Sequence, residues 1–237
     1  MPSTPRILAL DTATQACSLA LFGHGGLRRR HEMLARAHNR HILHMLSDVL
    51  KGEVLADSVD VVACGVGPGS FTGLRVAVSV AQGLAWSQRL PVHPFCSLRA
   101  QIYAAAGQDL LVEGDHVLST IDAQIGQLYG LWGVWTGCAV AADGSPFICT
   151  PDQIPVPDGS DKLVILGSGV NYQQQFSASR LAEAAQHGMI TPDAGVMATL
   201  LASGAISLDL QAAHLLTPQY VQRNIGWKKL SEQGRHD

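Results

Sequence analysis

Paired cysteines, long apolar runs and an excess of charge of one sign are all missing from this sequence of 237 residues. The five cysteines are odd in number and scattered, with no CxxC pair, which argues against a disulfide framework and for a reducing compartment. No run of about 18 apolar residues lacks polar interruptions, so no membrane span is expected. The net charge of −3 gives no general electrostatic attraction to nucleic acid. We therefore expect a cytoplasmic protein that would need a local basic patch or a basic partner to contact RNA.

Aromatic residues are also few, at 5%, but apolar residues make up 47% of the chain and charged residues only 15%. This balance allows a buried core and is not that of a disordered chain. The length fits one large domain or two of about 110 to 120 residues.

The start of the chain has the pattern of a β-meander. An apolar run over 6–10 ends at Asp11, a polar turn follows, and a second run covers 16–22. After a glycine-rich turn, residues 27–33 form a third candidate strand. Apolar spacing and turn signals predict the remaining elements. These are helices over 38–51, 71–86, 97–106, 179–186 and 195–203, strands over 59–64, 91–95, 116–121, 127–135, 163–166 and at the start of 218–229, and a loop or insertion over 144–160.

The strand–turn–strand unit at the start recurs near the middle of the chain. ILALDTATQACSLALF is followed, close to half a chain later, by VLSTIDAQIGQLYGLWG. In both, an apolar strand ends in an aspartate, Asp11 or Asp122, before a short polar turn and a returning strand. Such a repeat suggests two related lobes.

A glycine-rich loop, Gly65 to Gly69, lies between a strand and a long helix of small residues. It is neither a Walker A loop, since the lysine is missing, nor GxGxxG. It can be a tight strand-to-helix turn with Ser70 or Thr72 as the N-cap, or a loop that faces phosphate. Arg75 on the first turns of the helix could then pair with a phosphate or with a carboxylate of a partner.

Two further sets of polar residues leave alternatives open. Asp11 and its counterpart Asp122 could each bind Mg²⁺ through water or simply close an Asx turn. His38, His41 and His44 recur every three residues, as in a metal site, but no cysteine or carboxylate completes one at suitable spacing within that helix. A polar helix face or an interface is the simpler interpretation. Ser70 lacks a GxSxG frame, so no catalytic nucleophile is recognised.

Three stretches together resemble the TsaB (YeaZ) family. They are ILALDTATQACSLAL, GVGPGSFTGLRVAVSVAQGLAW and QYVQRNIGWKKL, and they span residues 7 to 230. The resemblance implies an α/β, actin-like (ASKHA/RNase H-like) fold with two related lobes, each a mixed β-sheet flanked by helices. The lobes would cover residues 1–110 and 111–237, with the last segment packing back toward the first lobe.

The resemblance also implies a function. Members of the family are non-catalytic scaffolds or activators of the TsaD threonylcarbamoyltransferase, which forms N6-threonylcarbamoyladenosine at position 37 of tRNAs that read ANN codons. TsaE would join the complex, self-association of the chain is also implied as possible, and tRNA would be reached indirectly through the complex. No cofactor is assigned to this chain alone, although ATP or ADP could bind at the joint with the partner. The alternatives are an autonomous actin-like ATPase or kinase and, less favoured, a glycoprotease-like metallopeptidase.

The family's partner surface is a bundle of first-lobe helices, here about 36–51 and 71–86. The catalytic paralogue carries an HxxxH metal pair, whereas the matching places here hold Pro94 and Leu98, so no metal site is expected. No catalytic residue is assigned. The expected partner-binding residues are His38, His41, Met45, Leu74, Arg75, Ala77, Val78 and Ala81. The vestigial or shared nucleotide-facing residues would be Asp11, Gly67, Pro68, Gly69, Ser70 and Thr72.

Overall fold

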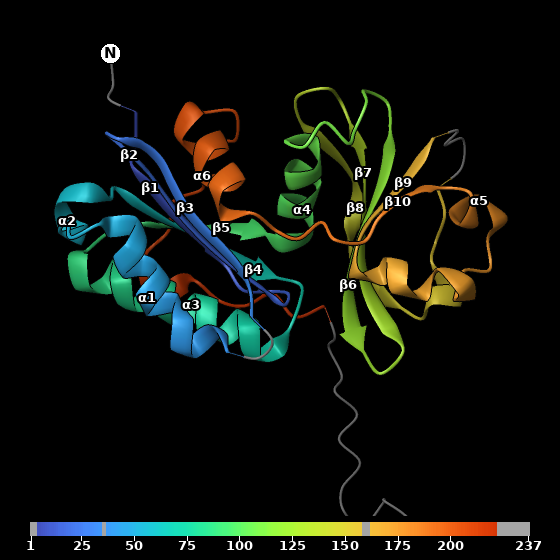
Figure 1. Cartoon of the computed structure of the whole chain (residues 1–237), viewed down its shortest axis with the longest axis horizontal. Helices are drawn as coiled ribbons and strands as arrows, with labels where there is room; N and C mark the ends of the chain where they lie inside the picture. Colours follow the sequence, from blue (N-terminus) through green and yellow to red (C-terminus); the bar gives the residue numbers. More distant parts are fainter. Residues whose placement is uncertain (1–3, 35–36, 158–161, 222–237) are drawn as a thin grey trace, which may run out of the picture.

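Two five-stranded sheets stand side by side in the computed structural model, which describes residues 4–34, 37–157 and 162–221 (Figure 1). The strand orders are β3-β2-β1-β4-β5 and β10-β9-β6-β7-β8. The first sheet contains β1 (Ile7–Asp11), β2 (Ala16–Gly23), β3 (Gly26–Met33), β4 (Val61–Gly67) and β5 (Val92–Cys96). The second contains β6 (His116–Gln124), β7 (Gln127–Trp135), β8 (Val140–Cys149), β9 (Leu163–Gly167) and β10 (Ala185–His187).

The two sheets share one topology. In the first, β1, β2 and β3 form an antiparallel meander, and β4 and β5 add in parallel beside β1. In the second, β6, β7 and β8 form the meander, and β9 and β10 add in parallel beside β6. The repeat read from the sequence is therefore confirmed as two lobes of an α/β fold, with Asp11 and Asp122 on equivalent central strands.

Helices cover both faces of the first sheet. α1 (His38–Leu50) and α3 (Phe71–Gln88) pack on one face, against Leu8 and Leu10 of β1, and α6 (Ala194–Ser203) packs on the other, beside Ile7 and Ala9. Alternate residues of a strand point to opposite faces, so a strand covered on both sides is a continuous apolar run. The short α2 (Leu55–Ser58) leads into β4.

Helix α4 (Ser97–Ala106) connects the two lobes. It stands between the two sheets and contacts strands of both (Figure 1). α6 comes from the second half of the sequence but lies on the first sheet. After α6 the chain pairs with the start of β5, where Val92 and Gln211 exchange backbone hydrogen bonds, and Leu216 is buried in the first-lobe core. A lobe boundary at residue 110 stays a prediction.

Several predicted elements are wrong or shifted. β8 occupies most of the first half of the predicted 144–160 loop; it is an edge strand, where proline and glycine are tolerated. The predicted helix over 179–186 is only one turn, α5 (Ser179–Ala182), because the following residues pair with β9 as β10. Residues 218–221 form no strand, and the rest of the predicted 218–229 segment lies outside the described residues.

Other elements follow the prediction closely. Helices α1, α3, α4 and α6 match the predicted ranges within two residues at each end. Three short 3-10 helices, η1 (Pro151–Gln153), η2 (Ser168–Gln175) and η3 (Ala213–Leu215), complete the described elements. Within the ranges that the structure describes, no helix has the length and apolar character needed to cross a membrane.

Candidate functional site

The carboxylate of Asp11 lies at the end of β1 and is closed off from solvent, with 1% of the residue exposed. Its Oδ1 accepts a hydrogen bond from the Ala13 backbone N–H at 2.8 Å, and its Oδ2 accepts one from the Ser97 hydroxyl at 2.6 Å. The first contact is an Asx turn, one of the two predicted roles. Burial disfavours the charged form and raises the pKa of Asp11 to about 6, against the opposing effect of these two hydrogen bonds.

The glycine loop packs directly onto this turn. A Cβ at Gly65 would collide with the Asp11 carboxylate, and one at Gly69 would collide with the Ala13 carbonyl oxygen. One at Gly73, in the first turn of α3, would collide with the Thr12 carbonyl oxygen. Glycine is needed at these places because two backbone segments approach each other closely.

Hydrogen bonds fasten the start of α3 to the same turn. The Ser70 N–H donates to the Ala13 carbonyl at 2.7 Å, and the Thr12 hydroxyl donates to the Gly73 carbonyl at 2.7 Å. The Ser70 hydroxyl accepts the Gly73 N–H at 3.3 Å, so Ser70 is the N-cap. β4 itself runs on to Gly67, so the loop is shorter than the sequence suggested.

The predicted nucleotide-facing residues divide by exposure. Asp11, Gly67, Pro68 and Gly69 are buried, whereas Ser70 and Thr72 are exposed at the start of α3. The buried members line a contact between parts of the same chain. Their assignment to a nucleotide remains a prediction, and only the start of α3 offers groups that an arriving molecule could touch.

The predicted partner-binding residues also divide by exposure, and their role in binding a partner stays a prediction. Most of its members point into the core of the first lobe, because the small side chains of α3 let that helix lie close to the sheet. Only His41 and Arg75 of the set are exposed. The buried members are His38, Met45, Leu74, Ala77, Val78 and Ala81.

The solvent side of α1 and α3 carries other residues. Leu43 of α1 is 60% exposed, and His44 lies next to it on the same exposed face. On α3, Ser79 is exposed, and a Cβ added at Gly83 would meet nothing within 4 Å. The buried apolar residues of α1 and α3 recur three and four positions apart along each helix. This spacing marks the side that faces the core, so it could have indicated from the sequence which positions face solvent.

Arg75 belongs to an exposed aromatic cluster that the sequence did not reveal. Its guanidinium carbon lies 3.7 Å from the centre of the Phe71 ring, and its Nε donates to the Tyr220 hydroxyl at 3.3 Å. The two rings are 5.2 Å apart. The contact joins α3 to a segment 145 residues away, so no local pattern could have signalled it.

His38, His41 and His44 do not form one cluster, because they differ in burial. His38 is buried and burial lowers its pKa, while His41 and His44 are exposed. His93 on β5 accepts the Asp209 backbone N–H at Nδ1, 2.9 Å away, and its burial also lowers its pKa. Among the residues whose placement is described, no three His, Cys, Asp or Glu side chains are grouped as metal ligands.

The chain is similar to known proteins over nearly its whole length. It is 32% identical to the tRNA threonylcarbamoyladenosine biosynthesis protein TsaB of Haemophilus influenzae, with 94% of this chain and 96% of that protein covered. It is 31% identical to the protein of the same name in Escherichia coli K12, with 95% and 98% covered. Residues 24–133 match the family described as TsaD: tRNA N6-adenosine threonylcarbamoyltransferase.

Two solved structures share the fold. YeaZ from Pseudomonas aeruginosa superposes with a TM-score of 0.80 at 28% identity, covering 91% of this chain and 99% of that one. A crystal structure titled as an uncharacterized protein with similarity to peptidase YEAZ from Pseudomonas aeruginosa gives a TM-score of 0.82 at 28% identity, with 92% and 100% covered. The actin-like, two-lobed fold expected from the sequence is thus confirmed.

Proposed function

This chain belongs to the TsaB family, and on that premise we propose that it is the non-catalytic partner of a TsaD-type threonylcarbamoyltransferase. A role in forming threonylcarbamoyladenosine in tRNA follows from relatives that it matches over almost their full length. The geometry of this chain favours a role in supporting a partner over a catalytic role of its own.

The observation that carries the proposal is the closure of the Asp11 site. In an actin-like fold this position is where a carboxylate could hold Mg²⁺ and nucleotide. Here both oxygens of Asp11 are engaged by Ala13 and Ser97, and the glycine loop is pressed against the turn. Because Asp11 is 1% exposed and each of its oxygens already accepts a hydrogen bond inside the chain, an arriving metal ion or nucleotide has no open approach to this carboxylate.

The proposed partner surface is the solvent side of α1 and α3. Leu43, His44 and His41 project from α1, and Gly83 gives α3 an open stretch where another helix could approach closely. A glycine in an exposed helix interior costs about 1 kcal/mol relative to alanine. A glycine at the exposed position 83 is easier to explain if a partner helix packs against it. Self-association through the same surface would exclude the TsaD-type partner.

The other parts of the proposal attach to this complex. TsaE would join once the pair has formed, and tRNA would reach the chain only through the complex. ATP or ADP would bind at the joint, where Ser70, Thr72 and Arg75 lie exposed at the start of α3.

The test combines Leu43→Glu with Gly83→Glu. Two carboxylates on the proposed surface should abolish copurification with the TsaD-type partner and lower threonylcarbamoyladenosine in cells that depend on this chain, because unpaired charges would be buried in the complex. Val112→Glu is the matched control, since Val112 is 64% exposed and belongs to the segment between α4 and β6, not to α1 or α3. Retention of the partner and of the modification by the double variant, with an unchanged melting temperature, would contradict the proposal.

The autonomous ATPase alternative makes an opposite prediction. Calorimetric titration of the isolated chain with Mg-ATP would give micromolar affinity and turnover if the chain were such an enzyme. Metal analysis serves the same purpose for the metallopeptidase alternative, which needs a stoichiometric zinc or iron ion.

A further inference from the structure

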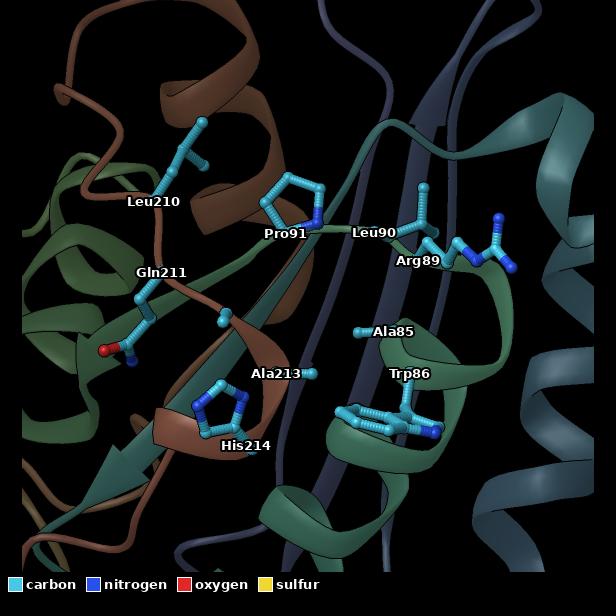
Figure 2. A pocket seen from close by; sticks show the side chains of 10 residues that line it. Ala85, Trp86, Arg89, Leu90, Pro91, Leu210, Gln211, Ala213 and His214 are labelled. Atoms are coloured by element: carbon cyan, nitrogen blue, oxygen red, sulfur yellow. The ribbon is translucent and has the colours of Figure 1, made fainter.

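Buried polar side chains converge at the joint between the two lobes, around helix α4. The surface hollow of about 710 Å³ at the C-terminal end of α3, between residues 85–91 and 210–214, has a different character (Figure 2). There the Arg89 guanidinium and the Gln211 amide point away from Trp86, to opposite sides of the hollow. The joint has a built set of polar contacts, and the hollow does not.

The apolar contacts of the joint do not by themselves fix the angle between the lobes. One continuous core runs through the joint, from Ile7 of the first sheet to Val117 of the second. Helix α4 lies in this core and fills much of it with alanine, at positions 100, 104 and 105. Burial of apolar surface is not directional, and packed helices can slide past their neighbours by small shear movements. Directional contacts are therefore needed to hold one orientation.

Gln101, in the middle of α4, supplies such contacts. It is fully buried, and its Nε2 donates to the Thr120 carbonyl of β6 at 3.3 Å and to the Ile190 carbonyl at 2.9 Å. Ile190 lies in residues 188–193, the crossover segment by which the chain passes from β10 to α6 on the first sheet. A Cβ at Gly167, the last residue of β9, would collide with the Gln101 Nε2, so a glycine there leaves room for the amide. One side chain thus meets β6, β9 and the crossover segment.

Two further hydrogen bonds join α4 to both lobes. The Ser97 hydroxyl donates to the Asp11 carboxylate of the first lobe at 2.6 Å. The Leu98 carbonyl accepts a hydrogen bond from the Ser119 hydroxyl of β6, in the second lobe, at 2.8 Å. Residues four apart on a helix share a face, so Ser97 and Gln101 hold the two lobes from the same face of α4.

The Gln101 amide also carries an unused acceptor. Its Nε2 faces two carbonyl oxygens, so turning the amide round would place Oε1 against them. In the part of the chain that the structure describes, Oε1 has no hydrogen-bond partner. A buried acceptor without a partner costs free energy. Stability alone therefore explains a glutamine here poorly, and a directional role explains it better.

We propose that Gln101 is a positioning residue that holds the two lobes at one fixed angle. Its two donated hydrogen bonds tie α4 to β6 and to the crossover segment, while Ser97 ties the same helix to β1. Without the amide, the apolar core of the joint remains, but α4 is free to slide against the second sheet, and the second lobe then reorients relative to the first. The inference goes beyond the proposed function and does not depend on it.

Gln101→Met tests the proposal, because it keeps the length and volume of the side chain but removes both donors together with the unused acceptor. The variant should fold, with a melting temperature within about 5 °C of the unchanged chain. Residual dipolar couplings of the backbone N–H groups, measured on the full chain in a dilute aligned medium, report the orientation of each lobe. One alignment tensor should fit both lobes of the unchanged chain. In Gln101→Met the tensors of the two lobes should differ in magnitude by about 20% or more.

Gln82→Met is the matched control. The Gln82 amide also joins distant segments, donating to the Leu216 carbonyl at 2.9 Å, but both residues belong to the first lobe. This variant should leave one tensor for both lobes. Gln101→Leu is the second variant should Gln101→Met not fold, since it too removes both donors and suits a buried helix. The proposal is overturned if one tensor still fits both lobes of the folded Gln101 variant, if Gln82→Met separates the lobes equally, or if the unchanged chain already needs two tensors.

Discussion

The two lobes place equivalent aspartates on equivalent strands, yet in different surroundings. Asp11 is sealed, with Ser97 from α4 on one oxygen and its own turn on the other. Asp122 is partly exposed, and its Oδ1 accepts hydrogen bonds from the Tyr172 hydroxyl at 3.0 Å and the Gln124 N–H at 2.7 Å. Both keep the Asx turn, so the turn belongs to the shared topology.

The difference lies in what closes over each aspartate. In the first lobe the glycine loop and α4 cover Asp11 completely. In the second lobe the chain after β9 tucks Gly169 against the side chain of Thr120 instead, and Asp122 keeps access to solvent. A repeated fold can thus turn one copy of a polar site into a structural contact. The following predictions test whether the first-lobe contact is structural in this sense.

The largest effect is expected at Gly73. Gly73→Ala places a methyl group against the Thr12 carbonyl oxygen, a backbone atom that cannot move aside without shifting β1 or α3. We expect a loss of about 3 kcal/mol or more in the free energy of unfolding, measured in urea. Gly83→Ala is the control in the same helix; its Cβ meets open space, so it should gain up to about 1 kcal/mol. Equal effects at the two glycines would show that the loop is not closely packed.

Removal of each carboxylate compares the lobes directly. Asp11→Ala leaves the buried Ser97 hydroxyl and the Ala13 N–H without their acceptor, and should cost about 2 to 4 kcal/mol. Asp122→Ala exposes its former partners to water and should cost about 1 kcal/mol or less. Both values come from urea unfolding at pH 7. A larger cost at Asp122 would reverse the comparison.

The pH dependence of stability should carry the signature of Asp11. Its pKa is about 6 in the folded chain against an ordinary 3.8, so the folded state keeps a proton that the unfolded state has already released. This contribution is full below the ordinary pKa and is lost as the pH rises through about 6. Relative to the non-titrating Asp11→Asn variant, the chain should lose about 2 to 3 kcal/mol between pH 3.5 and pH 7.

The Ser97 hydroxyl influences the pH at which this stability is lost. The Ser97 hydrogen bond favours the charged form and holds the pKa of Asp11 down. In Ser97→Ala the loss of stability should therefore extend to higher pH. If the difference in unfolding free energy between the chain and Asp11→Asn stayed constant from about pH 3.5 to pH 7, Asp11 would not be desolvated as the structure shows.

The repeated strand–turn–strand units and the helix after the glycine loop could be predicted because they carry local signals. Apolar runs that end in aspartate marked β1 and β6, and small residues with an N-cap serine marked α3. β8 escaped because an edge strand tolerates the glycine and proline that usually mark a loop.

The surroundings of the site were less accessible from sequence. The Asx turn at Asp11 is local and was one of two alternatives, but Ser97 reaches Asp11 across 86 residues, and only the packing of α4 brings it there. The side of α3 on which most of the predicted partner-binding residues lie is buried within the first lobe, and their role in binding a partner stays a prediction. Small residues allow a close approach of any element, and nothing local tells whether the sheet or a second protein makes it.

The smallest expected effect separates the two hydroxyl donors. Tyr172→Phe removes a hydrogen bond to Asp122, whose carboxylate remains in contact with water, and should change the free energy of unfolding by about 0.5 kcal/mol or less. Ser97→Ala removes the donor to a sealed oxygen and should cost about 1 to 3 kcal/mol. Urea unfolding of both variants at pH 7 gives the comparison. Each change removes one hydroxyl that donates to one aspartate. The difference between the two losses of unfolding free energy therefore measures how completely Asp11 is closed off from water, and equal losses would mean that water reaches Asp11.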